Sequence, residues 1–305
     1  MQNILSLKFA KLHGPTFIIV AAILWALDGV LRRSLFSLQP LTIVFYEHLI
    51  GSLILLPLVW RSVTSIKLTK QSILLICGIA LLSGLLGTLW FTTALTKINF
   101  IPFSVVFLLQ KLQPLFAATT AAIFLKEKIS GRYLAWAGVA LAAGYFVTFP
   151  GGVVNTATGA ATTIAALYAL GAAAAWGSST TFSKMLLNTY STQVSTALRF
   201  FTTTAFAFVA VVLFQDVSQL FVVSGSQLLR FTTIALSTGM IALYLYYKGL
   251  QFTEARVSTI LELTFPVLAV AIDAFVYKSM LTPGQIIAAV ILFYAMSRTA
   301  KLNRA

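Results

Sequence analysis

The sequence predicts an all-α polytopic membrane protein with ten transmembrane helices in two five-helix halves of opposite orientation. Three observations support this fold class: the composition, a regular succession of apolar runs, and a weak repetition of the first half in the second. Hydrophobic residues make up 59% of the 305 residues and charged residues only 9%, whereas a soluble domain has roughly a quarter charged residues. The chain has too little polar surface to face water on all sides, so most of it is expected to face lipid.

Ten apolar runs have about the length, roughly 20 residues, at which a helix crosses the hydrocarbon core. The runs are continuous rather than alternating, which excludes a transmembrane barrel and leaves helices. The first run follows Lys8 and Lys11. It is longer than the core of a signal peptide and lacks a small-residue cleavage site, so we interpret it as a retained helix. In order, the runs cover residues 15–35, 41–60, 70–95, 102–125, 131–149, 158–187, 192–214, 227–250, 255–277 and 282–299.

The basic residues predict the orientation in the membrane. Of the 21 lysines and arginines, 14 lie on the side of the N-terminus and two, Lys111 and Arg199, lie inside runs. The other side has only Arg32, Arg33, Lys97, Arg230 and Lys278. Cytoplasmic loops carry the excess of basic residues, so both termini are expected in the cytoplasm. The expected location is the inner (plasma) membrane of the cell.

Several function classes are excluded by what the sequence lacks. The net charge of +14 forms no basic stripe, so nucleic acid is not an expected partner. Cys77 is the only cysteine, and His13 and His48 are the only histidines, which leaves no metal cluster and no nucleophile–base arrangement. No HExxH, P-loop or GxGxxG motif occurs. We therefore expect neither an enzyme nor a cofactor, and no ATP hydrolysis.

The two halves of the chain, 1–150 and 151–305, repeat the same order of features. Pro114 aligns with Pro266 at an offset of 152 residues, and Trp25 aligns with Trp176 at an offset of 151. Each half has five runs, an odd number, so the second half enters the membrane from the opposite side. Such an inverted repeat is typical of alternating-access transporters, with the site near the midplane where the halves meet. The alternative is a chance likeness of two apolar halves.

The segment "QPLFAATTAAIFLKEKISGRYLAWAGVALAAGYF" and the paired tryptophans resemble the EamA-like branch of the drug/metabolite transporter superfamily. The resemblance covers nearly the whole chain. It implies that helices one to four and six to nine surround a central cavity, with helices five and ten at the periphery. It also implies export of amino acids, drugs or other metabolites, and related branches carry nucleotide sugars and phosphorylated sugars. In the first half Glu127 ends the fourth helix, whereas Ser279 stands at the matching place in the second half.

Lys111 is the first candidate for substrate contact. It lies about 14 Å from the start of its run at 1.5 Å per residue, near the middle of a core about 30 Å thick. Gln110 and Gln113 flank it and make the segment more polar than a lipid-facing helix requires. An ionisable residue at this depth is a functional candidate by default. The alternative is a structural lysine bonded to carbonyls or to a fixed carboxylate.

Glu262 supplies an anion at similar depth from the other half, because Gln110 aligns with Glu262. Three arrangements stay open: an ion pair of Lys111 with Glu262, separate contacts to the two ends of a zwitterion, or a proton-linked carboxylate.

The remaining intramembrane polar residues are weaker candidates. Arg199 is a candidate anion contact or inner gate, and Trp25 and Tyr244 are candidates for the cavity wall. Asp28, Glu47 and His48 join Glu262 as candidates for proton coupling. Adjacent helical residues point in different directions, so Glu47 and His48 are not both expected to face the cavity. Interhelical hydrogen bonding is the alternative role for this pair.

Taken together, the residues predict a secondary active transporter for a small polar or zwitterionic metabolite such as an amino acid. The lipid bilayer is its other partner, and protons are the candidate coupling ion. An anion exchanger for phosphorylated or nucleotide-linked sugars is the alternative within transport. A channel or helical scaffold without turnover is the alternative from another class.

Overall fold

The computed structural model describes residues 2–96, 109–110, 112–152, 160–265, 267–268, 271 and 282–302. Within these residues helices occur in all ten predicted runs and no strand occurs, so the all-α prediction is confirmed. The helices of the first half are α1 (Gln2–Arg33), α2 (Pro40–Thr64), α3 (Lys70–Ile79), η1 (Ala80–Gly87), α4 (Thr88–Thr96), α6 (Gln113–Thr120), η2 (Ala121–Leu125) and α7 (Gly131–Thr148). Those of the second half are η3 (Pro150–Gly152), α8 (Ala160–Leu187), α9 (Thr192–Phe214), η4 (Val217–Leu220), α10 (Gly225–Ile234), η5 (Ala235–Gly239), α11 (Met240–Leu250), α12 (Ala255–Leu261) and α14 (Pro283–Leu302).

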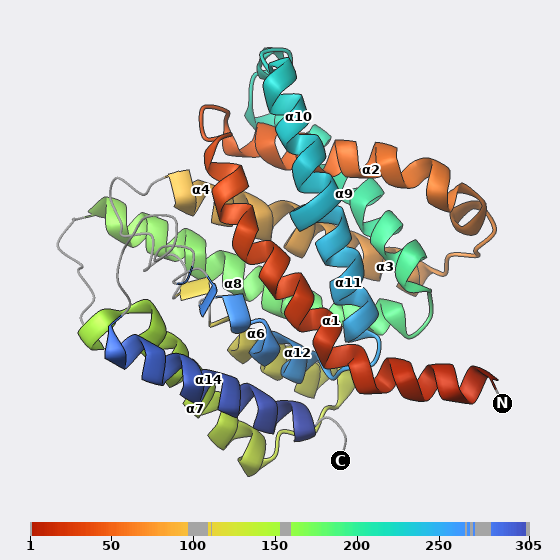
Figure 1. Ribbon diagram of the computed structural model, residues 1–305. Helices are drawn as coiled ribbons and strands as arrows, with labels where there is room; N and C mark the ends of the chain where they lie inside the picture. Colours follow the sequence, from red (N-terminus) through yellow and green to blue (C-terminus); the bar gives the residue numbers. More distant parts are fainter. Residues whose placement is uncertain are drawn as a thin grey trace.

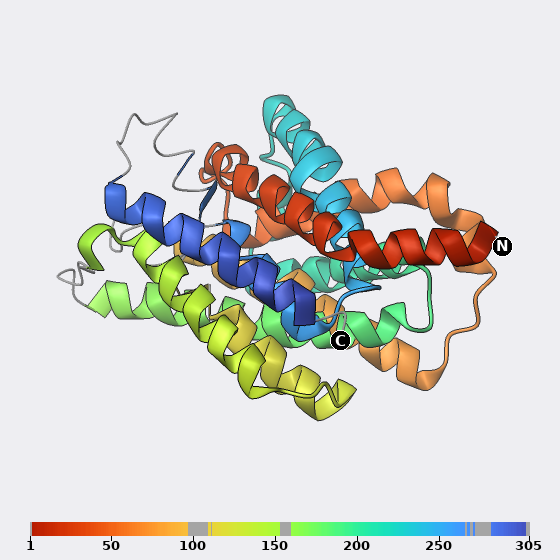
Figure 2. The same ribbon diagram turned by 60° about the horizontal axis from the view of Figure 1, so that its bottom comes forward.

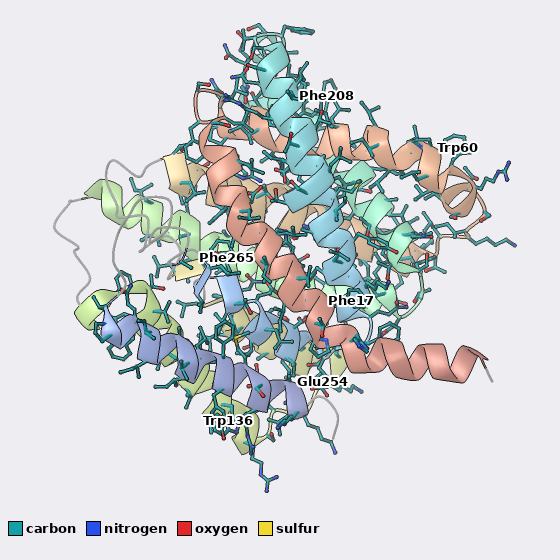
Figure 3. The ribbon with its side chains drawn as sticks, in the orientation of Figure 1. Phe17, Trp60, Trp136, Phe208, Glu254 and Phe265 are labelled. Carbon is teal, nitrogen blue, oxygen red and sulfur yellow. The ribbon has the colours of Figure 1, made fainter. Side chains whose placement is uncertain are left out.

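Five helical segments of the described chain are long and apolar enough to cross a membrane: Pro40–Thr64, Lys70–Thr96, Thr192–Phe214, Gly225–Leu250 and Pro283–Leu302. Large apolar side chains cover the outside of the bundle, as lipid-facing helices require. Trp60 and Phe208, for example, lie at the rim of the bundle in Figure 3.

Helix α1 begins at Gln2, earlier than the predicted start near Pro15. The preceding residues are mostly good helix formers such as leucine, lysine and alanine. Pro15 removes one backbone hydrogen bond and bends a helix without necessarily ending it. Figure 1 shows the N-terminal part of α1 at an angle to the rest.

Side-chain caps explain where several helices begin. Thr69, Ser130, Ser191 and Ser224 each accept a hydrogen bond from the backbone N–H three residues later. Each cap satisfies one of the first N–H groups of its helix, which have no partner inside the helix. The η2 turn ends at Lys126, whose φ of 57° cannot continue a right-handed helix.

The helices pack in pairs that relate the two halves. Helices α7 and α14, the fifth and tenth runs, lie side by side at one edge of the bundle in both ribbon views (Figures 1 and 2). Helix α2 packs along α9, the second run against the seventh. At that contact the Ser52 and Thr204 hydroxyls are 2.9 Å apart, and Thr204 lies one position beyond the residue that matches Ser52 at the 151-residue offset. Equivalent elements that meet each other are what a twofold relation between the halves produces.

Glycines allow the closest helix approaches. A Cβ atom on Gly177 of α8 would lie 2.6 Å from the Gln113 carbonyl oxygen, and one on Gly249 of α11 would lie 2.6 Å from the Gly14 carbonyl oxygen. Any larger residue would push these helices apart.

Two sets of contacts define the ends of the bundle. At one end, Tyr190 donates to the Lys67 carbonyl and Thr192 to the Gln251 side chain, and Glu127 meets the start of α12. We call this the inner end. At the other, outer end, Arg230 donates to the Ser34 carbonyl. The described loops before α3, α7, α9 and α12 therefore lie together at the inner end.

The third and eighth runs each contain a π-helical turn, η1 and η5. Both turns end at a glycine, Gly87 and Gly239, which match at the 152-residue offset. Single π-turns inside α-helices are rare and are frequent at functional sites. Residues of both turns or their flanks face the same cavity, described next.

Candidate functional site

A cavity lies at the junction of the two halves. The empty space inside it is about 1030 Å³ when its opening to solvent is included. Its wall comes from α1, α2, η1, α4, α8, α9, η5 and α11, and from residues 110, 113, 262 and 265. No described residue of α7 or α14 lines it, so the peripheral position implied for the fifth and tenth helices is confirmed.

Two aromatic pairs form part of the cavity wall, and each contains one of the two tryptophans that match in the repeat. Trp25 of α1 and Tyr246 of α11 have ring centroids 5.1 Å apart, and Phe91 of α4 and Trp176 of α8 have centroids 5.2 Å apart. The Trp176 indole N–H donates to the Ser83 carbonyl of the π-turn η1 at 3.0 Å. Each pair thus joins one half of the chain to the other through a repeated tryptophan.

A buried cluster of charges lies on α1 and α2. The Arg32 Nε is 2.7 Å from Asp28 Oδ2, and Arg32 Nη2 is 2.9 Å from Glu47 Oε2. Thr238 of the η5 turn donates its hydroxyl to Asp28 at 2.6 Å. Arg32 is only 4% exposed. Each carboxylate is thus paired with the same guanidinium, and buried ions need such a partner.

The second half has no equivalent of this cluster. At the 151-residue offset Asp28, Arg32 and Glu47 align with Ser179, Ser183 and Leu198. The two serines line the cavity from α8. One repeat therefore supplies paired charges to the cavity, and the other supplies hydroxyl groups.

The predicted contacts around the middle of the fourth and ninth runs are partly described. Gln113 Nε2 donates to Glu262 Oε2 at 3.0 Å, and both residues and Gln110 line the cavity. Lys111 lies outside the described residues, so its relation to Glu262 stays a prediction. The structure does bring together the anion and the two glutamines that the sequence singled out.

Arg199 and His48 also line the cavity, at the matched positions of α9 and α2. Arg199 Nη1 donates a hydrogen bond to the Tyr247 hydroxyl at 3.3 Å. His48 Nδ1 is 2.9 Å from the Val44 carbonyl oxygen of its own helix, and its ring packs on Phe200 with centroids 5.1 Å apart.

Glu47 and His48 both line the cavity, so the prediction that they would not is wrong. Adjacent residues on a helix are separated by about 100°, from 3.6 residues per turn. A cavity that wraps around this much of α2 can reach both side chains.

The tyrosines of α11 are arranged differently from the sequence interpretation. Tyr244 is not among the residues that line the cavity, whereas Tyr246 is. The Tyr246 hydroxyl is 3.1 Å from Thr180 Oγ1 and 3.3 Å from Ser258 Oγ. Tyr246 therefore connects α8, α11 and α12 at the cavity floor.

Sequence reasoning missed several residues that line this cavity. Arg32 was assigned to the outer side rather than to the cavity, although its i,i+4 spacing from Asp28 is a signal for an ion pair. Trp176, Ser179, Thr180, Ser183 and Thr238 were not singled out as site residues. The alignment of Trp176 and Ser179 with Trp25 and Asp28 could have found the first two.

Four buried polar atoms of the wall make no hydrogen bond within the described part of the chain: Arg32 Nη1, Gln110 Oε1, Ser179 Oγ and Arg199 Nε. Leaving a buried donor or acceptor without a partner costs about 1–3 kcal/mol. These atoms are therefore available to a ligand or to water. No group of three or more metal-binding side chains occurs among the described residues.

An apolar helical bundle of two matched halves, with a cavity of buried polar groups at their junction, defines a polytopic membrane transporter. The model of the EamA-like transporter family matches residues 12–149 and 163–297. The chain belongs to this family, and it is a transporter of metabolites, not an enzyme.

Two curated relatives extend over most of the chain. A riboflavin transporter, ImpX, of Fusobacterium nucleatum subsp. nucleatum is 37% identical over 296 residues, 96% of this chain and 99% of the relative. An uncharacterized transporter of Clostridium kluyveri is 27% identical over 274 residues, 84% of this chain and 83% of the relative. One crystal structure of a protein covers 95% of this chain and 97% of its own, with a TM-score of 0.73 and 19% identity. That likeness concerns the fold alone.

Proposed function

We propose that this protein carries riboflavin or a closely related flavin across the membrane. Two repeats, 1–150 and 151–305, would expose the cavity alternately to the two ends of the bundle. The similarity to a riboflavin transporter over 96% of the chain supports the substrate. A flavin combines a flat heteroaromatic ring, a polar pyrimidine edge and a polyhydroxyl chain, and it is uncharged at neutral pH.

The cavity wall carries this proposal, because it combines paired aromatic rings with buried polar atoms that lack partners. Trp25 and Trp176 approach from opposite repeats, and stacking of a flat base on an aromatic side chain contributes about 1–3 kcal/mol. Gln110 Oε1 can accept from a ring N–H group, and Arg199 Nε can donate to a ring carbonyl. The Ser179 hydroxyl can do both and suits a polyol.

The charge arrangement supports an uncharged substrate. Asp28, Arg32 and Glu47 are paired with one another at 2.7 and 2.9 Å. A neutral ligand leaves these pairs intact, whereas an ionic ligand would compete with them for the same partners.

A zwitterion such as an amino acid is the second candidate, favoured by one observation. Arg199 and Glu262 line the same cavity from different helices, and they would contact a carboxylate and an ammonium group. Phosphorylated sugars, with Lys111 and Arg199 as phosphate contacts, are the third class to compare.

Glu262 is our proposal for a proton-coupling residue. Asp28 and Glu47 share the cation Arg32, and His48 is bonded to a carbonyl of its own helix. Glu262 lies outside the Arg32 cluster and accepts a hydrogen bond from Gln113 Nε2, so a change in its charge leaves the Arg32 pairs intact.

Counterflow in proteoliposomes tests the substrate. Vesicles loaded with unlabelled riboflavin should accumulate external labelled riboflavin, and an excess of amino acids or sugar phosphates should not compete. The same preloaded vesicles measure efflux, the direction that the family resemblance favours. A channel would show no stimulation by internal substrate. Counterflow of amino acids without flavin would replace the first candidate by the second.

A matched pair of tryptophan variants connects the result to the cavity. Trp25→Leu should weaken flavin binding by roughly fivefold to thirtyfold, which corresponds to about 1–2 kcal/mol of lost stacking. Trp60→Leu is the control, because Trp60 is 58% exposed at the rim of the bundle. Equal losses in both variants would remove the cavity from the binding role.

A further inference from the structure

Outside the cavity, a second buried cluster of charges lies at the inner end, where the loop after η2 meets the start of α12. Glu127 Oε1 accepts from the Ala255 backbone N–H at 2.8 Å, and Glu127 Oε2 accepts from the Arg256 N–H at 3.2 Å. The Arg256 Nε is 3.6 Å from Glu127 Oε2. A single carboxylate of the first repeat thus holds both the backbone and a side chain of the second.

Arg256 is enclosed on its other sides. Its Nε is 2.8 Å from Glu254 Oε2, and its guanidinium carbon lies 4.8 Å from the ring centroid of Tyr133 of α7. The Tyr133 hydroxyl donates to the Arg256 carbonyl at 3.2 Å. Arg256 is only 5% exposed, so the cluster is a packed junction and not a surface ion pair.

Glu127 depends on these partners for its charge. Burial raises the pKa of its carboxyl, and the N–H groups of Ala255 and Arg256 oppose that shift. If these partners moved away while water stayed excluded, a buried anion would be left uncompensated, which is strongly unfavourable. The contact therefore favours one arrangement of α12 against the first repeat.

A buried layer lies between the cavity and the cluster at the inner end. Beyond the cavity floor, Tyr247, Leu250 and Ser258 are fully buried. Ser258 lies on α12, directly between Glu127's contacts at the helix start and Glu262 at its end. Movement of α12 away from the loop after η2 would open this layer.

The repeat alignment shows that the cluster has no charged counterpart at the other end. At the 152-residue offset Glu127 aligns with Ser279, and Arg256 aligns with Ser104. Two serines cannot form the ion pair. The state closed at the inner end therefore contains the Glu127–Arg256 ion pair. The state closed at the outer end has no ion pair at the equivalent positions.

We propose that Glu127 and Arg256 form a latch between the two repeats, which holds the inner end of the cavity closed and opens in each transport cycle. The latch biases the resting protein toward the state open at the outer end. It acts through the position of α12, and its residues do not touch the substrate.

Cysteine accessibility tests the latch without any substrate, so the result is independent of the flavin proposal. The reporter is Ser258→Cys in a Cys77→Ser background, reacted with a membrane-impermeant maleimide in sealed vesicles of both orientations. With the native latch, labelling should be slow from either side. Glu127→Gln removes the charge and should accelerate labelling roughly tenfold, only from the side of the inner end.

Three comparisons separate latch opening from general loosening. Asp216→Asn removes one negative charge from an exposed outer loop and should leave the Ser258→Cys rate unchanged. A second reporter, Ser179→Cys in the cavity wall, should react faster from the inner end but not from the outer end in the Glu127→Gln background. Arg256→Lys keeps the charge but loses the planar guanidinium, and it should accelerate labelling of Ser258→Cys in the same direction.

If Glu127→Gln is not recovered as folded protein, Arg256→Lys carries the test alone. Equal labelling of Ser258→Cys with the native latch and with either latch variant would overturn the proposal. So would acceleration of both reporters from both sides of the membrane, because that indicates loosening of the whole bundle.

Discussion

Replacing Arg32 by methionine should destabilise the protein more than any other single charge removal in the cavity. Arg32 is the shared partner of Asp28 and Glu47, at 2.7 and 2.9 Å. Methionine fills a similar volume but leaves two buried carboxylates without their cation. Removing one partner of a buried ion pair costs about 3–5 kcal/mol, and here one substitution breaks two contacts.

The expected loss is measurable as a shift of the thermal unfolding midpoint in detergent. At about 2–4 °C per kcal/mol for domains of 150–250 residues, Arg32→Met should lower the midpoint by roughly 6 °C or more. Adding Glu47→Gln should recover part of the loss. Asp28 then remains the single carboxylate, and it keeps the Thr238 hydroxyl at 2.6 Å.

The matched control uses the repeat. Ser183 occupies the position equivalent to Arg32, and its hydroxyl is 2.9 Å from that of Tyr247. Ser183→Ala should lower the midpoint much less, since a neutral hydrogen bond contributes about 0.5–1.5 kcal/mol. An unchanged midpoint in Arg32→Met, or no recovery in the double variant, would falsify the stabilisation of both carboxylates by Arg32.

Four further predictions concern coupling, binding, packing and topology. Glu262→Gln should abolish proton-driven transport but leave counterflow measurable, and an unaltered pH dependence would exclude Glu262 from coupling. Lys111→Met should remove substrate-induced thermal stabilisation without impairing insertion, whereas recovery of transport on adding Glu262→Gln would indicate a structural ion pair instead. Gly177→Val should separate α8 from the fourth run and reduce the yield of folded protein, because even a Cβ there lies 2.6 Å from the Gln113 carbonyl oxygen; Gly138→Val, with open space around the Cβ position, is its control. Reporter fusions at the C-terminus and near Gly151 should report opposite sides of the membrane, and the same side for both would contradict the five-plus-five topology.

Local signals explain why most helix bounds were predictable. The run 192–214 coincides with α9, because Ser191 caps its first turn and the apolar stretch ends where the polar residues Gln215 and Asp216 begin. Helix α1 was harder to delimit, since the sequence pattern treats Pro15 as a boundary although the structure accommodates it inside the helix.

The phase of a helix face was less predictable than its bounds. Depth along the eighth run singles out Tyr244 on α11, whereas Tyr246 lines the cavity. The π-turn η5 precedes α11, and the wider turn changes which residues share a face. The composition of "ALSTG" does not predict a π-helical turn, because the formation of such a turn depends on how the helix packs.

Long-range pairing explains the remaining differences at the site. The alignment brought Gln110 and Glu262 to similar depth, and both line the cavity. The partnership of Arg32 with Glu47 joins residues on two helices, and only the crossing of α1 and α2 determines it. Hydropathy identifies a helix as a span but carries little information about such crossings.

The hydroxyl contact between Ser52 and Thr204 has a consequence for how the protein can be studied. These residues lie within one position of being images of each other in the repeat, and their oxygens are 2.9 Å apart where α2 packs on α9, so the contact lies close to the pseudo-twofold axis. A point on such an axis is its own image. If the two repeats exchange conformations during transport, the distance between positions 52 and 204 is the same in both states. Distances between non-equivalent residues at either end of the bundle change. A pair of spectroscopic labels at positions 52 and 204 would thus give a constant reference distance. Changes measured between labels at the two ends can be compared with that reference.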